Sequence, residues 1–308
     1  MQRRNLLILG GAAVAAGIGK AALSAMDAGS SLILNEPSGA SGAIASVPAT
    51  RNQPLLRFVA TADTGSSNEN QYAVAAAMTR CYQQNPYKLV VLAGDNIYDN
   101  GEIGKISSAF EQPYQTLLKN GVIFRACLGN HDIRSANGDR QVQYPGFNMP
   151  GRYYTFRDKA VQFFVLDTNV NVDWSAQRPW LEKELSRSNA LWKIVYGHHP
   201  IYSSGVYGNT QAFIDSLSPL FKKYGVQLYI NGHEHSYERT RPINGTTYLI
   251  TGNGGAYLRP VGRSPWTEYS VSRYGFTAFE VFSDRINVQA IATDHQVFDR
   301  GTIPLKAA

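Results

Sequence analysis

Cysteine is scarce in this chain, which carries only Cys81 and Cys127 among its 308 residues. Two cysteines are too few for a disulfide framework, and they exclude a structural zinc site built from four thiolates. A single disulfide between them stays open, but Cys127 lies in the apolar stretch VIFRACL. A buried free thiol is therefore the preferred interpretation of Cys127.

Charged residues are also few, because Asp, Glu, Lys and Arg together make up 17% of the chain. The formal net charge is +6, and residues 1–30 contribute +2 of it, so the remainder of the chain carries +4. No dense run of lysine and arginine accompanies this mild excess. We therefore expect no nucleic-acid partner.

The apolar run at 6–19 has 14 residues, which is too short for a comfortable membrane span. It follows Arg3 and Arg4, and this start resembles a bacterial twin-arginine export signal. We expect a signal peptide over 1–27 and then a flexible tether over 28–52, which is rich in Gly, Ser, Ala and Pro. The mature protein would be exported to the periplasm or the outside of the cell, and an uncleaved membrane anchor is the alternative.

After residue 53 the chain alternates between strand-like and helical stretches, and it then becomes rich in strands. The patterns predict strands at 55–63, 87–95, 122–132, 160–168, 191–200 and 226–230, helices at 70–84, 107–120, 175–188 and 210–224, and successive strands from 246 to 293. No repeat and no second composition regime appear. The sequence therefore predicts one α/β domain over 53–308 that contains more than one sheet.

Polar side chains that can bind metals follow these predicted strands, and five of the six histidines are among them. In open α/β folds, functional groups gather at the carboxyl ends of the strands. A mixture of imidazole, carboxylate and amide ligands suits divalent or trivalent first-row metals. So many candidate ligands favour two metals bridged by a carboxylate. The candidates are Asp63, Asp95, Asn130, His131, Asp132, Asp167, His198, His199, His233 and His235.

The segment INGHEHSYER (230–239) places His233 and His235 two residues apart. The helical zinc-protease pattern needs histidines four apart, so that pattern is excluded. Residues two apart share a face on an extended chain. We therefore expect an extended segment after the strand at 226–230, with both imidazoles pointing the same way.

Five short blocks resemble, in order and content, the calcineurin-like metallophosphoesterases, and within them the purple acid phosphatases. The blocks are DTG at 63–65, GDNIY at 94–98, GNHD at 129–132, VYGH at 195–198 and GHEH at 232–235. Each block alone is a weak signal, whereas the ordered set is strong. Tyr98 discriminates between subfamilies, because most metallophosphoesterases lack a tyrosine there. We expect the short, mammalian-type form of a purple acid phosphatase.

The resemblance implies a four-layer α/β/β/α sandwich, with two stacked sheets between helices and a metal site at the carboxyl ends of strands. It implies one metal bound by Asp63, Asp95, Tyr98 and His235, and a second bound by Asp95, Asn130, His198 and His233. A phenolate is a hard donor that favours Fe(III), so the first metal would be ferric. The second metal would be divalent Fe, Zn or Mn.

The activity that the resemblance implies is that of an acid phosphatase, which hydrolyses small phosphate monoesters by in-line attack of a metal-bound hydroxide. His131 would meet the phosphate or the leaving group, and Asp132 would orient it. His199 is a third candidate catalytic residue, which either faces the substrate or packs. An exported phosphodiesterase or nucleotidase on the same scaffold is the alternative enzyme. A non-catalytic metal-binding or adhesion protein is the alternative of another class, although such a protein would normally have lost ligands.

Overall fold

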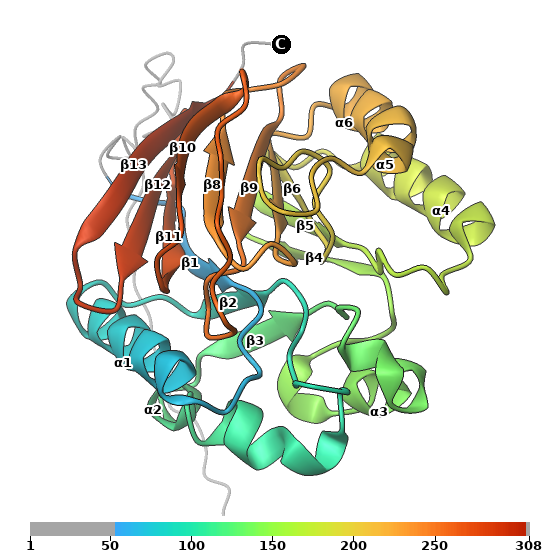
Figure 1. Ribbon diagram of the computed structural model, residues 1–308. Coiled ribbons are helices and arrows are strands. Elements are labelled where there is room, and N and C mark those ends of the chain that lie inside the picture. Colours follow the sequence, from blue (N-terminus) through green and yellow to red (C-terminus); the bar gives the residue numbers. More distant parts are fainter. Residues whose placement is uncertain (1–52, 306–308) are drawn as a thin grey trace, which may run out of the picture. The chain divides into compact units, whose positions relative to one another are not determined.

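The strands of residues 53–305, the part of the chain that the computed structural model describes, form two mixed sheets (Figure 1). The six-stranded sheet has the order β13-β12-β11-β1-β2-β3, and the seven-stranded sheet has the order β10-β8-β9-β7-β6-β5-β4. Strands β1, β2 and β3 are parallel, and so are β5, β6, β7 and β9, whereas the outer strands pair antiparallel.

The strands have the following bounds: β1 Leu56–Thr61, β2 Leu89–Leu92, β3 Ile123–Ala126, β4 Tyr154–Asp158, β5 Val161–Val165, β6 Trp192–Tyr196, β7 Leu228–Asn231, β8 Tyr237–Thr240, β9 Thr247–Thr251, β10 Thr267–Val271, β11 Gly275–Val281, β12 Arg285–Ala292 and β13 Val297–Pro304. The α-helices are α1 Glu69–Gln84, α2 Gln115–Lys119, α3 Asp139–Val142, α4 Trp174–Arg187, α5 Gln211–Ser216 and α6 Ser218–Tyr224. Short 3-10 turns cover Ile103–Lys105, Asp132–Arg134, Ala136–Gly138 and Pro145–Phe147, and a π-helical turn covers Ser107–Glu111.

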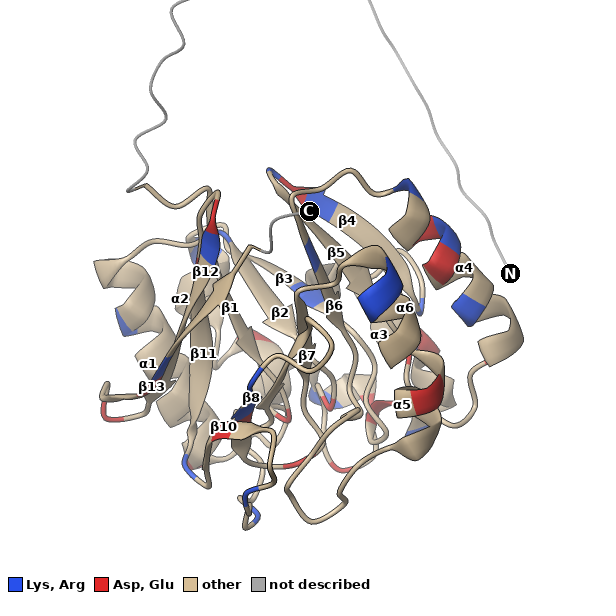
Figure 2. Ribbon diagram, turned by 90° about the horizontal axis from the view of Figure 1, so that it is seen from above, with Lys and Arg blue, Asp and Glu red and all other residues tan. Residues whose placement is uncertain are grey.

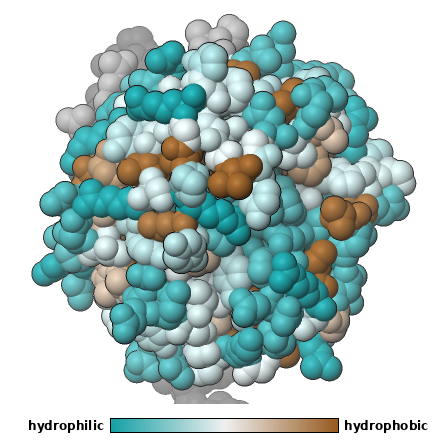
Figure 3. Space-filling model, in the orientation of Figure 1, coloured by the Kyte–Doolittle hydropathy of each residue, from teal (hydrophilic) through white to brown (hydrophobic). Residues whose placement is uncertain are grey.

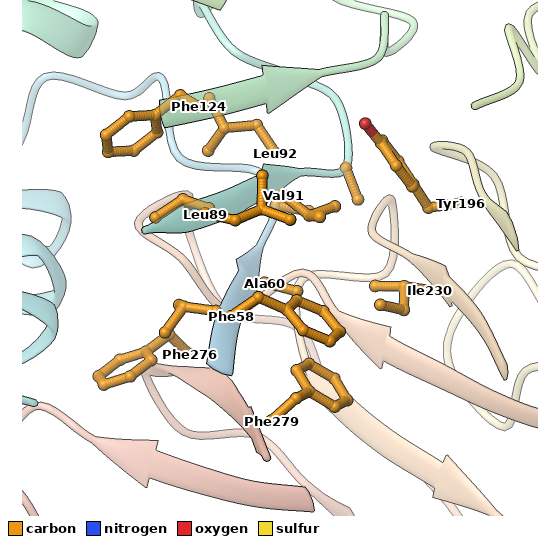
Figure 4. Packing of buried hydrophobic residues seen from close by; sticks show 14 of the residues in the cluster. Phe58, Ala60, Leu89, Val91, Leu92, Phe124, Tyr196, Ile230, Phe276 and Phe279 are labelled. Atoms are coloured by element: carbon orange, nitrogen blue, oxygen red, sulfur yellow. The ribbon is translucent and has the colours of Figure 1, made fainter. Parts of the chain in front are cut away.

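Two hydrophobic cores hold the layers together. The larger core fills the space between the sheets, where the rings of Phe58 and Phe279 stack 4.4 Å apart and Ile230 of the other sheet points toward them (Figure 4). The second core lies between the seven-stranded sheet and helices α4, α5 and α6. Successive side chains of a strand point to opposite faces of its sheet. In β5, Phe163 accordingly belongs to the inter-sheet core and Phe164 to the helix-facing core.

Helices cover the outer face of each sheet, so the predicted four-layer arrangement is confirmed (Figure 1). Helix α1 packs Val74 and Met78 against the six-stranded sheet, and α4 packs Leu181 and Leu185 against the seven-stranded one. Figure 2 shows that lysine, arginine, aspartate and glutamate lie mainly on helices and loops, whereas the strands are largely uncharged. On the face drawn in Figure 3, apolar residues form small separate groups in a mainly hydrophilic surface.

The helices predicted at 107–120 and 210–224 are each interrupted, so those two predictions are wrong in their continuity. Pro113 lies in the first, and the chain forms a π-helical turn before it and α2 after it. Proline lacks the N–H that a continuous helix would use. Pro219 stands in the first turn of α6, and it separates that helix from α5. The predicted helix at 70–84 is confirmed as α1, which Asn68 caps by accepting from the Gln71 amide at 3.0 Å.

Cys81 and Cys127 are both free thiols, and Cys127 is buried, as the sequence indicated. The predicted signal peptide (1–27) and tether (28–52) lie outside the described residues. Within 53–305, no helix combines the length and the apolar character that crossing a membrane requires.

Candidate metal centre

The candidate ligands converge at the carboxyl ends of strands from both sheets. Asp63 follows β1, Asp95 and Tyr98 follow β2, and Asn130 follows β3 in the six-stranded sheet. His198 follows β6 and the pair His233 and His235 follows β7 in the seven-stranded sheet. Because the sheets are stacked, the parallel strands of each bring their ends to one common edge.

The first group of side chains surrounds the Tyr98 hydroxyl. That oxygen lies 3.0 Å from Asp63 Oδ1, 2.9 Å from Asp95 Oδ2 and 3.1 Å from His235 Nε2. His235 Nε2 is also 3.3 Å from Asp63 Oδ1. Asp63, Asp95 and His235 are buried, and each offers an atom within 4.8 Å of those offered by the other two. This group is the set that the family resemblance implies for the first metal.

The second group surrounds the side-chain oxygen of Asn130. Asn130 Oδ1 lies 3.1 Å from His198 Nε2 and 2.9 Å from His233 Nδ1. His198 Nε2 is 3.4 Å from Asp95 Oδ2, the same carboxylate oxygen that contacts the Tyr98 hydroxyl. Asp95 therefore lies between the two groups, in the position expected of a bridging ligand.

The donor set fits a cation better than it fits a network of hydrogen bonds. The Tyr98 hydroxyl has one proton, yet two carboxylate oxygens and an imidazole nitrogen surround it. His198 Nδ1 lies 3.0 Å from the carbonyl oxygen of Ala93, which can only accept, so this nitrogen carries the proton. In the neutral ring, the lone pair of Nε2 then faces the oxygens of Asp95 and Asn130. A metal ion between these atoms would accept the lone pairs of the imidazole nitrogen and the oxygens, which otherwise face one another in a buried space.

Backbone carbonyls fix the orientation of two imidazoles. His235 Nδ1 donates to the carbonyl of Tyr257 at 2.8 Å, and His198 Nδ1 donates to that of Ala93. Each bond leaves Nε2 directed at the centre. Such outer contacts orient metal-binding histidines in general and select the tautomer that can coordinate.

Electrostatics of the centre without a cation show the same demand for positive charge. Burial lowers the pKa of His198, but the Asp95 carboxylate overrides this and raises it to about 10. Burial and the charge of His198 lower the pKa of His233 to about 2, which keeps that imidazole neutral. Burial and the carboxylates of Asp63 and Asp95 raise the pKa of Tyr98 well above its usual range. An imidazolium thus balances the carboxylates where a metal would otherwise do so.

His131 lies beside the first group and is not part of it. Its Nε2 is 4.0 Å from Asp95 Oδ2, and its ring packs at 4.4 Å on that of Tyr98. Nδ1 donates to the carbonyl of Asp99 at 2.6 Å, and Nε2 accepts from Arg134 Nη2 at 3.2 Å. The sequence did not indicate Arg134, which lies three residues after His131 on the 3-10 turn.

The expectation that Asp132 orients the His131 imidazole is wrong. The Asp132 side chain is fully buried and points away from His131 into the loop that carries Asp95. Its carboxylate accepts, at 2.8 to 3.1 Å, from N–H groups of Asn96, Ile97, Gly129 and Gln141. Asp132 therefore fastens the loop after β2 to the loop after β3, and these loops carry ligand candidates.

His199 packs against the second group. Its ring lies 4.5 Å from that of His233 and 5.1 Å from that of His198. The Thr168 hydroxyl lies 2.9 Å from His199 Nδ1 and accepts from the backbone amides of both His198 and His199. Burial and the charge of His198 lower the pKa of His199 to about 3. The catalytic role of His199 stays a prediction. Asp167, in contrast, forms an ion pair with Arg152 at 2.8 Å.

The segment with His233 and His235 is not extended, so that prediction is wrong. Strand β7 ends at Asn231, and His233 has φ +71°, in the left-handed region. Asp63 and Asp95 share that unusual backbone, with φ +56° and +52°. Non-glycine residues with such dihedrals gather at functional sites. The turn sends His233 to the second group and His235 to the first.

Three residues that the sequence did not single out hold the surroundings of His233. The buried Glu234 carboxylate accepts from the amides of Val206 and Tyr207 at 2.9 and 2.7 Å and thereby fixes loop 203–207. The Tyr207 ring stacks on His233 at 4.5 Å, and the Arg259 guanidinium lies 5.0 Å above the Tyr207 ring. Arg259 Nη1 also donates to the carbonyl of His233 at 2.8 Å. Only the position of Glu234 inside GHEH could have drawn attention to it.

A cleft of about 630 Å³ opens beside the first group. Its lining includes Tyr98, His131 and His235 of the centre. Lys105, Tyr257 and Arg259 also line it. Ser66, Ser67, Asn68, Asp99, Ser108 and Ala256 complete the lining. The candidate centre is therefore accessible to a small anionic molecule.

The chain is similar in sequence to known phosphoesterases. The family model of the calcineurin-like phosphoesterase matches residues 56–237. Mouse tartrate-resistant acid phosphatase type 5 is 28% identical over 67% of this chain and 74% of its own. Purple acid phosphatase 7 of Arabidopsis thaliana is 27% identical over 82% of this chain and 87% of its own.

Solved structures share the fold. Purple acid phosphatase PPD1 from yellow lupin seeds has a TM-score of 0.68 at 20% identity, over 81% of this chain and 53% of its own. GAP50, the anchor in the inner membrane complex of Plasmodium, has a TM-score of 0.72 at 21% identity, over 82% of this chain and 89% of its own. At these identities the structures establish the fold alone.

Proposed function

Because the chain belongs to the calcineurin-like phosphoesterase family, we propose that it is an acid phosphatase that hydrolyses phosphate monoesters at a dinuclear metal centre. The observation that carries this proposal is the Tyr98 hydroxyl, which lies within 3.1 Å of Asp63, Asp95 and His235. A tyrosine among two carboxylates and a histidine sets this centre apart from a plain carboxylate–histidine site. The relatives named acid phosphatases support the same reaction class.

The two groups would each hold one metal, and Asp95 would hold both. Asp63, Tyr98 and His235 complete the first site, and a phenolate ligand favours Fe(III) there. Asn130, His198 and His233 complete the second site, which suits divalent Fe, Zn or Mn. When bound, the metals supply an activated water as the nucleophile and positive charge for the phosphoryl oxygens.

The protein's own residues prepare this chemistry. The Nδ1–H bonds of His198 and His235 to backbone carbonyls keep both Nε2 lone pairs aimed at the centre. We assign proton donation to the leaving oxygen to His131, which lines the cleft. The proton that is transferred must then sit on Nε2, since Nδ1 already donates to the carbonyl of Asp99. Arg134, which donates to that Nε2, has to give way during the step.

Fold similarity to GAP50 keeps the non-catalytic alternative in view, because a shared fold does not imply a shared function. The side chains argue for catalysis, since all seven candidate ligands are present and converge within two connected groups. A phosphodiesterase or nucleotidase would use the same centre, so the choice between it and a monoesterase needs substrates.

The test is metal analysis and a visible spectrum of the purified protein, with hydrolysis of matched mono- and diesters from about pH 4 to 8. We expect two metals per chain, a coloured oxidised form and a preference for monoesters at acidic pH. Tyr98→Phe should bleach the colour and keep much of the metal. A colourless, iron-free and fully active enzyme would contradict the ferric assignment. A preference for diesters would show that the protein is a phosphodiesterase and not a monoesterase.

We further propose that the protein is exported folded and metal-loaded by the twin-arginine route, on the basis of Arg3 and Arg4 before NLLIL. Replacement of both arginines by lysine should retain activity in the cytoplasm, as measured by cell fractionation. Unchanged export of the double variant would instead point to the general secretion route or to an anchor.

A further inference from the structure

A second cavity, of about 140 Å³, lies between helix α1 and the outer face of the six-stranded sheet. None of its lining residues lines the cleft or belongs to either group of candidate ligands. Its floor includes Arg57 and Val59 of β1 and Ala278 and Glu280 of β11. Residues two apart on a strand share a face, and the register pairs Arg57 with Glu280 and Val59 with Ala278. The floor is therefore a continuous patch of the sheet.

One face of α1 forms the opposite wall of this cavity. Ala77, Arg80, Cys81 and Gln84 all line it, and their spacing of three, four and seven residues places them on the same side of the helix. Ala77 on the helix and Ala278 on the sheet are small, so they leave space that larger side chains would fill. Protein interiors contain few voids larger than a water molecule, and an unfilled void loses packing contacts. A ligand in this space would restore those contacts.

The lining combines apolar side chains with one uncompensated positive charge. Val59 and Ala77 are buried, and Ala278 is half-buried. Arg57 donates to Glu280 at 2.9 Å, so these two charges compensate each other. Arg80 is exposed and forms no ion pair with any residue of 53–305. The cavity thus suits a ligand that is apolar at one end and negatively charged at the other.

We propose that this cavity binds a small organic anion of the aryl carboxylate class, with its ring between α1 and the sheet and its carboxylate at Arg80. The size fits a single ring, because an apolar cavity of about 150 Å³ takes up benzene. The guanidinium of arginine matches the geometry of a carboxylate with two parallel hydrogen bonds. The proposal goes beyond the proposed function and is independent of it, since no residue of the metal centre takes part.

Cys81 supplies a readout of binding in the unlabelled protein. It lines the cavity as a half-buried free thiol, whereas Cys127 is fully buried, so alkylation of the folded protein reports on Cys81. Burial and the charge of Glu280 raise the pKa of the Cys81 thiol to about 11. Its reaction with iodoacetamide at about pH 8 should therefore be slow enough to follow by mass spectrometry. A ligand in the cavity should slow the reaction further by excluding the reagent.

The experiment measures the alkylation rate of metal-loaded protein with benzoate as the probe, in excess inorganic phosphate so that phosphate and not benzoate occupies the metal centre. We expect a dissociation constant on the order of 1 mM for so small a ligand. Benzoate at about 10 mM should then lower the rate about tenfold. Benzyl alcohol keeps the ring without the charge, and acetate keeps the charge without the ring. Equal protection by either compound, or no protection by benzoate, would overturn the proposal.

Two variants locate the binding site. Ala278→Leu should fill the cavity and abolish the effect of benzoate on the rate, measured against the same variant without benzoate. Arg80→Gln, an exposed change with little effect on folding, should weaken benzoate about threefold to tenfold and leave the affinity for benzyl alcohol unchanged. Arg140→Gln is the matched control, since Arg140 is exposed and does not line the cavity, and it should behave as wild type. Undiminished protection by benzoate in Ala278→Leu or in Arg80→Gln would place the ligand elsewhere and overturn the proposal.

Discussion

His131 and Asp132 are neighbours in GNHD, yet the structure gives them unrelated surroundings. His131 faces the cleft, and its contacts are with Asp99, Arg134 and the Tyr98 ring. Asp132 is buried and serves as an acceptor for the N–H groups of two loops. The first residue therefore can act on a substrate, whereas the second acts on the loops that hold ligand candidates.

Two substitutions separate these roles. His131→Ala should lower kcat by about 10²–10⁴ through loss of proton donation, with metal content and stability near wild type. Asp132→Asn should lower the free energy of unfolding by about 2–4 kcal/mol, because the amide presents donors to N–H groups that need an acceptor. Urea denaturation, metal analysis and kcat of both variants provide the measurement. Loss of a metal in His131→Ala would show that His131 is a ligand, and a stable but inactive Asp132→Asn would restore a direct catalytic role for Asp132.

The raised pKa of His198 predicts how the stability of the metal-free protein depends on pH. Its folded-state pKa is raised to about 10 by Asp95, against an unfolded value of about 6.5. A raised pKa stabilises the fold below the unfolded value, and this stabilisation is lost as the pH rises through the folded value. Chelated protein should therefore lose stability between about pH 6.5 and 10, by an amount on the order of a few kcal/mol at about 1.4 kcal/mol per pKa unit.

Urea denaturation of chelated and metal-loaded protein across this pH range tests the expectation. A bound metal requires neutral His198, so the decline should be absent from the loaded form. His198→Gln is the matched control, because it removes the titrating group and should flatten this part of the profile. An equal decline in chelated wild type and in His198→Gln would assign the effect to another residue.

At the scale of elements, loop 203–207 is held by two carboxylates, that of Glu234 in the segment after β7 and that of Glu238 in β8. The Glu234 carboxylate accepts from the amides of Val206 and Tyr207 and from the Ser203 hydroxyl at 2.7 to 3.0 Å. The loop in turn places Tyr207 on His233. Glu234, which lies between two ligand candidates, thus connects the loop to the centre.

Glu234→Gln should loosen this loop. One of the two carboxylate oxygens that accept from backbone N–H groups becomes an NH₂ group, which can only donate. Hydrogen exchange at the amides of Val206 and Tyr207 should become faster by about tenfold or more, with exchange in β7 and β9 unchanged. Ser203→Ala is a milder matched control, since it removes the hydroxyl that donates to Glu234 and accepts from the Gly205 amide but keeps the Glu234 bonds to Val206 and Tyr207. Protection of the loop that stays at wild-type level in Glu234→Gln would mean that the bonds of Ser204 to Glu238 and Gly262 suffice to hold it.

The sequence predicted the elements that rest on local patterns and failed where distant contacts decide. The apolar runs of the parallel strands and the helical pattern of α1 are local, and those strands and α1 were found. The break at Pro219 is also a local signal, but it was outweighed by the helical pattern on both sides. The turn at His233 and the stack of Arg259 on Tyr207 depend on residues far apart in the chain. The five motif blocks are short and local, so they identified the candidate ligands. The loops that line the cleft carry no such motif, and their roles were not predicted.

At the scale of the whole molecule, the inter-sheet core couples the two halves of the centre. Phe58 of β1 stacks on Phe279 at 4.4 Å and meets Phe163 of the other sheet edge-on at 5.3 Å. Phe58→Ala should therefore cost about 3–5 kcal/mol of unfolding free energy, and Phe58→Leu should cost less because it keeps most of the volume. Denaturation followed by fluorescence and by metal release should show one coincident transition. Separate transitions would mean that the sheets unfold independently.

Asp63, Asp95 and Asn130 come from one sheet, and His198, His233 and His235 come from the other. A cation bound there would hold both sheets at once, and its affinity would add to the cohesion of the whole sandwich by mass action. The metal-free protein would then open more often at the interface between the two sheets. Proteases act on such openings. Metal supply would in this way set the lifetime of the protein as well as its activity, and poorly loaded copies would be the first to be degraded.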